Sequence, residues 1–158
     1  MTQPRPVGRQ MQAKSAFAGA TVELERTAPL DADEDVLLHG AMRLRGAGLL
    51  PRPVVLRLTA GRLTVLAHYA FRPDRVWDLP RGAVRDAELV GDALHVTWVS
   101  DQAGNTAVLK LTGWSGRSAL DRALRDPGAV AGVLLAWLTS PDGQLPVLQP
   151  PSHRQSER

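Results

Sequence analysis

The amino-acid sequence predicts a mainly β fold, a seven-stranded antiparallel barrel or sandwich capped by one amphipathic α-helix near the C-terminus. Two observations support this prediction. Between residues 36 and 112, short segments of alternating apolar and polar residues recur at near-regular spacing, separated by turn residues. From residue 127, apolar residues recur with the period of a helix instead. The first pattern is typical of antiparallel strands with one buried face, and the second of a helix with one buried side.

The composition is that of one globular domain. The 158 residues are 44% hydrophobic and 22% charged, which is enough for a substantial core. Cysteine is absent, which excludes disulfides, thiolate catalysis and thiolate metal sites. No apolar run approaches the roughly 18 residues of a membrane span, and the basic N-terminus has no apolar signal-peptide core. We therefore expect a cytoplasmic protein.

Four regions follow from changes in composition along the chain. Residues 1–20 mix Pro, Gly, Gln and Arg without a period and predict a flexible basic arm. Residues 21–35 form an acidic lead-in, of which 21–27 alternates weakly and is a candidate extra strand. The domain itself is expected over residues 36–139. Residues 140–158 are rich in proline and predict a disordered tail.

Seven strands are expected within the domain. Most have apolar residues at every second position, and turn residues such as Gly91-Asp92 separate them. The predicted strands cover residues 36–45, 53–59, 62–69, 75–79, 83–90, 93–99 and 106–112.

The predicted C-terminal helix has a clear start and one apolar side. Asp126 and Pro127 have the residue types preferred at the N-cap and at the first helical position. Burying the apolar side at about 25 cal/mol per Å² would contribute several kcal/mol, so we expect the helix to close the open end of the β core. The apolar residues, spaced at i, i+3, i+4, i+7 and i+8, are Val130, Val133, Leu134, Trp137 and Leu138.

Three stretches resemble the pattern of GRAM and bacterial PH-like domains. They are Gly61-Arg62-Leu63-Thr64-Val65-Leu66, Val76-Trp77-Asp78-Leu79-Pro80 and Ala83-Val84. The resemblance covers about residues 36–139 and implies the PH-like superfold of seven strands and one helix. It further implies a non-enzymatic binding module, a protein-interaction adaptor or small scaffold subunit. Such folds bind peptides along an edge strand or in the groove beside the helix, so a protein partner or self-association is expected.

The segment between the first two predicted strands offers an alternative function. In lipid-binding PH domains this loop carries basic residues that hold a phosphorylated headgroup. Here Val55 beside Arg57 breaks the usual basic pair, which argues against specific phosphoinositide recognition. An apolar tip with basic shoulders still suits a peripheral adaptor at an anionic membrane, where each Arg contributes about 1 kcal/mol. The candidate residues are Arg43, Arg45, Leu49, Leu50, Arg52 and Arg57.

That alternative places the protein at the inner face of the membrane and depends on the Arg45–Arg52 loop. The competing interpretation is that Leu49 and Leu50 fold back onto the barrel while the arginines only solubilise the surface. Trp114 is a further candidate partner contact, since Gly113 and Gly116 place it in a predicted turn. The other three tryptophans are expected in the core.

No catalytic, metal or cofactor site is predicted. The histidines lack the spacing of metal ligands, and His68 and His95 are expected to face solvent. The stretch 31–35 begins like a calcium loop, but Val36 and Met42 stand where Gly and Glu are required. Nucleophile-elbow and phosphate-loop motifs are absent. Nucleic acid is disfavoured as a partner because 4 Trp, 1 Tyr and 2 Phe are too few for a stacking platform.

Overall fold

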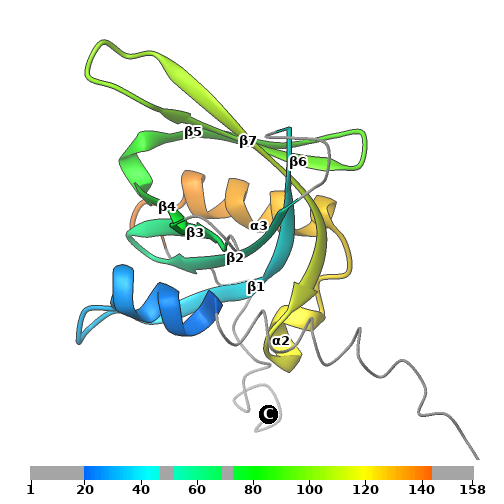
Figure 1. The fold of residues 1–158 in the computed structure, drawn as a ribbon. Helices are drawn as coiled ribbons and strands as arrows, with labels where there is room; N and C mark the ends of the chain where they lie inside the picture. Colours follow the sequence, from blue (N-terminus) through cyan, green and yellow to red (C-terminus); the bar gives the residue numbers. More distant parts are fainter. Residues whose placement is uncertain (1–19, 47–51, 69–72, 144–158) are drawn as a thin grey trace, which may run out of the picture.

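The computed structural model describes residues 20–46, 52–68 and 73–143. Seven strands form one antiparallel sheet in the order β4-β3-β2-β1-β7-β6-β5, which curls into a half-barrel (Figure 1). This confirms the predicted fold class. The strands are β1 (Val36–Arg45), β2 (Arg52–Thr59), β3 (Arg62–Ala67), β4 (Arg75–Pro80), β5 (Val84–Val90), β6 (Ala93–Val99) and β7 (Thr106–Gly116).

The described helices are short, apart from the last. They are residues 20–27, the 3₁₀ turn η1 (Arg81–Ala83), α2 (Ala119–Arg122) and α3 (Pro127–Thr139). In Figure 1, α3 crosses the interior of the curled sheet. The predicted N-cap is confirmed, because the Asp126 side chain accepts a hydrogen bond of 2.9 Å from the Ala129 amide.

The main core lies between the inner face of the sheet and α3. Trp137 is fully buried, and its Nε1 donates to the Ala60 carbonyl at 3.0 Å. Of the five apolar residues predicted on one side of the helix, four are buried and Leu138 is half-buried. The α3 residues in the core are Val130, Ala131, Val133, Leu134 and Trp137.

Arg81 fixes the C-terminal end of α3. Its Nη1 donates to the carbonyls of Trp137, Leu138 and Ser140, and its Nη2 to that of Pro141, at 2.7 to 3.3 Å. The last carbonyls of a helix have no partner within the helix, and they carry partial negative charge. A guanidinium from the β4–β5 connection therefore satisfies them and ties α3 to the sheet.

Residues 20–27 are helical, so the predicted extra strand is wrong. Ala20, Leu24 and Ala28 are spaced at i, i+4 and i+8, which places them on one side of a helix. That side packs on the outer face of the sheet, against Val55, Leu66 and the half-buried Val76. Burial of this helical face outweighs the weak alternation that suggested a strand. As a result β2 and β3 are covered on both faces.

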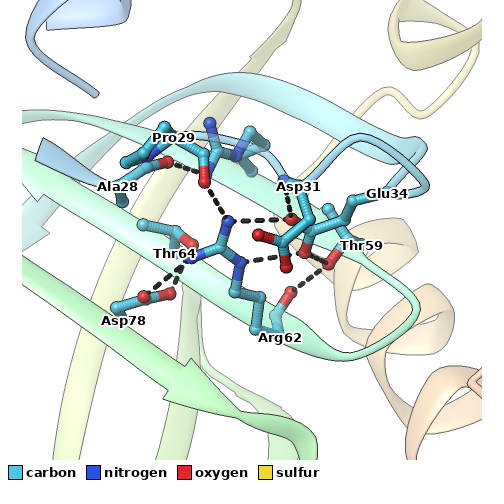
Figure 2. A network of polar contacts seen from close by, with 9 residues as sticks. Ala28, Pro29, Asp31, Glu34, Thr59, Arg62, Thr64 and Asp78 are labelled. Carbon is cyan, nitrogen blue, oxygen red and sulfur yellow. Dashed lines mark hydrogen bonds and ion pairs between the residues drawn. The ribbon is translucent and has the colours of Figure 1, made fainter. Parts of the chain in front are cut away.

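A polar network holds the chain after this helix against the sheet (Figure 2). Arg62 donates to both carboxylate oxygens of Glu34 at 2.8 Å, to the Pro29 carbonyl at 2.6 Å and to Asp78 at 2.9 Å. Thr59 adds a 2.6 Å bond to Glu34. The hydrogen bond from Arg62 lowers the pKa of Glu34 from 4.5 to about 2. Part of the acidic lead-in is thus bound to the sheet.

Candidate functional site

Three of the residues predicted to bind lipid or a partner lie on the surface at the neighbouring ends of β1 and β2. Arg43, Arg45 and Arg52 are all exposed. Arg45 donates to both carboxylate oxygens of Asp92 at 3.0 and 3.1 Å, so its charge is partly compensated. The predicted apolar tip, Leu49-Leu50, lies outside the described residues.

Arg57 and Trp114 are not placed on that surface. Arg57 is only 2% exposed, because residues 20–28 cover its face of the sheet and its Nη2 donates to the Ala28 carbonyl at 2.5 Å. Trp114 lies in β7 rather than in a turn and is half-buried. Its ring packs against Gly40, and its Nε1 donates to the Asp121 carbonyl at 2.9 Å. Neither side chain is presented freely to a partner.

His39 is a buried polar residue that the sequence did not single out. It lies opposite Arg57 on the neighbouring strand, and its Nδ1 is 3.3 Å from the Arg117 guanidinium. Its amide donates to Asp121 at 3.3 Å. Burial, followed by the charge of Arg117, lowers the pKa of His39 from 6.5 to about 4. It is therefore neutral at physiological pH. By contrast His68 is exposed and lies 2.9 Å from Asp74.

β5 is one of the two edge strands of the sheet, with β4 at the opposite edge. Among the described strands β5 pairs only with β6. The two join through the Gly91-Asp92 turn, in which Gly91 has φ of 63°. In a two-residue hairpin the residues that flank the turn, here Val90 and Ala93, form a hydrogen-bonded pair. Along the two strands, non-hydrogen-bonded and hydrogen-bonded pairs then alternate, and the amides of non-hydrogen-bonded residues point away from the partner strand. The amides of Ala87 and Leu89 should therefore face the free edge.

Helix α3 packs beside β5, and we call the surface between the free edge of β5 and the adjoining side of α3 the groove. Near the start of α3, Gly128 lies against Leu89 of β5: a Cβ added to Gly128 would be 3.2 Å from Cδ2 of Leu89. At the other end Leu138 of α3 lies beside Val84. Gly128, Leu135 and Leu138 share one side of α3 by helical spacing. Leu89 and Leu135 are large apolar residues left 47% and 41% exposed.

The Leu138 end of the groove opens into a hollow of about 360 Å³. Val84 and Leu138 supply apolar surface there, and two arginines supply positive charge. The lining residues are Arg81, Gly82, Val84, Arg85 and Leu138. The groove thus combines an unpaired strand edge, exposed leucines and a basic end. The sequence pointed only in general terms to an edge strand or a groove beside the helix, and it assigned none of these residues to a binding site.

Comparisons with known proteins bear on the fold alone. No protein-family model matches the chain. No curated protein matches it in sequence. Among solved structures it is similar to the hSac2 domain from the human phosphoinositide phosphatase Sac2, with a TM-score of 0.49 and 12% identity, over 78% of this chain and 79% of that chain. The β architecture therefore rests on the strand order given above, and the GRAM and PH-like resemblance stays a prediction.

Two further observations concern the part of the chain that the structure describes. None of its helices has the length and apolar character needed to cross a membrane. Within the same residues, no group of three or more histidine and acidic side chains is arranged to hold a metal ion.

Proposed function

We propose that this protein is a non-enzymatic protein-interaction module, an adaptor or small scaffold subunit, that binds an extended segment of a partner protein along β5. The observation that carries the proposal is the unpaired edge of β5, with α3 beside it and Leu89 and Leu135 exposed on the two walls. An exposed edge strand is a template for pairing, which native proteins normally protect. Among the residues that the structure describes, this edge has no strand partner and lies beside a helix.

The chemistry of such binding follows from strand geometry. An added strand would take hydrogen bonds from the edge amides of β5, and these bonds would supply sequence-independent affinity. Alternate side chains of the added strand would point into the groove between β5 and α3. There they would contact Leu89 and Leu135, which would supply preference for apolar residues. Both walls are preformed, which lowers the entropic cost of binding.

A selection experiment tests this proposal. Random linear peptides displayed on phage are selected against the full chain, and the affinities of enriched peptides are measured by fluorescence anisotropy. Leu89→Asp and Leu135→Asp should each weaken binding by tenfold or more. Val108→Asp is the matched control, because Val108 is equally exposed, at 46%, but lies on β7 away from the groove. Equal affinity in all three variants would refute the proposed site.

Hydrogen exchange provides a second readout that depends on the backbone alone. Peptide binding should slow exchange of the Ala87 and Leu89 amides, which face the free edge. The Glu88 and Val90 amides already belong to the ladder with β6 and should change little. Protection of none of these four amides by an enriched peptide would show that it binds elsewhere. Light scattering after size exclusion distinguishes a foreign partner from self-association through the same edge.

A further inference from the structure

We infer that the segment bound in this groove carries a carboxylate that pairs with Arg85 at the hollow. The inference rests on the proposed function and adds the charge of the partner and the position of that charge. Its basis is the uneven charge of the hollow at the Leu138 end of the groove. Two of the five residues that line the hollow are arginines, and none is acidic.

Arg85 is the side chain available to bind the carboxylate of the partner. It is exposed, and its Nη1 donates a hydrogen bond of 2.6 Å to the Gly82 carbonyl. That bond orients the guanidinium without neutralising it, because a carbonyl carries no net charge. Among the described residues Arg85 forms no ion pair with a carboxylate within 4.0 Å. Its other donors remain for a bidentate partner, the geometry that guanidinium and carboxylate share.

The strand itself turns Arg85 toward this end of the groove. The pairing of β5 with β6 shifts register between Val84 and Asp86, so Arg85 is the extra residue of a β-bulge. Bulges bend a strand and redirect a side chain. Arg81 has a different role at the hollow, since it is occupied by the four carbonyls at the end of α3. We therefore assign recognition to Arg85 and support of the wall to Arg81.

The register of β5 also gives the spacing that the partner needs. Arg85 and Leu89 are four residues apart, which corresponds to about 13 Å along a strand. A segment paired with β5 should thus carry an acidic group about four positions from an apolar residue that packs beside Leu89. The acidic group could be an Asp or Glu side chain or the terminal carboxylate of the partner, since both present the same two oxygens.

The phage selection tests the inference with two libraries, one with free peptide C-termini and one with internal peptides. We expect an acidic residue about four positions from an apolar one in the internal library. Enrichment only at free C-termini, lost in the amidated peptide, would identify a terminal carboxylate instead. Arg85→Glu should weaken an enriched acidic peptide by at least about fivefold, since it replaces attraction by repulsion. Lys110→Glu is the control, with the same charge change on the outer face of β7.

The outcomes separate the two proposals. Peptides that need Leu89 and Leu135 but show no acidic preference, and bind Arg85→Glu as tightly as the native protein, would overturn the carboxylate inference alone. Failure to enrich any peptide dependent on Leu89 and Leu135 would overturn both. Arg85→Gln keeps the size of the side chain while removing its charge, and should give an intermediate loss. Thermal unfolding of each variant establishes that the fold is intact, as expected for an exposed side chain.

Discussion

Replacing Glu34 by glutamine should lower the free energy of unfolding by about 2 to 3 kcal/mol at neutral pH. The carboxylate accepts two hydrogen bonds from Arg62 and one from Thr59 (Figure 2). A pKa lowered from 4.5 to about 2 corresponds to about 3 kcal/mol of stabilisation, from which partial solvent contact subtracts. Glutamine keeps the shape and the acceptor oxygen but removes the charge.

The sign of the pH dependence makes this test specific. Because folding lowers the pKa of Glu34, its contribution is complete above pH 4.5 and declines as the pH falls toward 2. Urea unfolding followed by tryptophan fluorescence, at a series of pH values from 7 to 3, measures the difference between the native protein and Glu34→Gln. The difference should shrink steadily below pH 4.5. Glu88→Gln, on the exposed surface of β5, is the control.

Two results would refute this reasoning. One is a difference of the same size at pH 7 and at pH 3, which would mean that the substitution acts through packing rather than through charge. The other is a difference below about 0.5 kcal/mol at pH 7, the level of an exposed ion pair. Either result would show that the Glu34–Arg62 pair does not hold residues 28–34 against the sheet.

Three other predictions follow from the structure. Arg81→Met should lower the free energy of unfolding by about 2 kcal/mol, because the carbonyls at the end of α3 lose their charged donor. Thermal unfolding measures the loss, and an unchanged midpoint would contradict the prediction. Since burial lowers the pKa of His39 to about 4, stability should fall as the pH drops below 6.5, by up to about 3 kcal/mol at pH 4. His39→Gln should flatten that profile, and an equally steep profile in the variant would assign it to other groups. Binding to phosphatidylserine vesicles, measured by sedimentation, should be weak because Asp92 compensates the charge of Arg45. Strong, salt-sensitive binding that is lost in the double variant Leu49→Asp/Leu50→Asp would instead support the membrane alternative.

The strands and α3 could be predicted from the sequence because each has a local, repeated signal. Alternation along β2 and β3 marks their inner faces, and Asp126-Pro127 marks the start of α3. The helix over residues 20–27 could not be predicted in this way. It has only two turns, and its apolar residues are too few to distinguish a helical period from alternation.

The candidate site was less accessible to sequence reasoning for a related reason. Arg57 has the alternation of an outward-facing strand residue, yet a helix from a distant part of the chain covers it. The groove depends on β5 lying at the edge of the sheet, which is a property of strand order rather than of local sequence. Nothing in the local sequence distinguishes Leu89 and Leu135 from other leucines; their places on β5 and on the adjoining side of α3 depend on strand register and on how the helix packs. The charge of Arg85 is likewise visible in the sequence, but only the structure shows that Arg85 forms no ion pair with any described carboxylate, although Asp86 follows it in the chain.

The helix over residues 20–27 has a consequence for where this protein can be divided. A fragment that begins at Val36, the first residue of the sheet, would leave Val55, Leu66 and Val76 facing water. It would also remove the Ala28 carbonyl that accepts from Arg57 and the Glu34 carboxylate, one of the two that pair with Arg62. The smallest unit expected to fold independently therefore starts well upstream of the first strand. Trimming the protein to its visible β core would remove one of its two hydrophobic clusters.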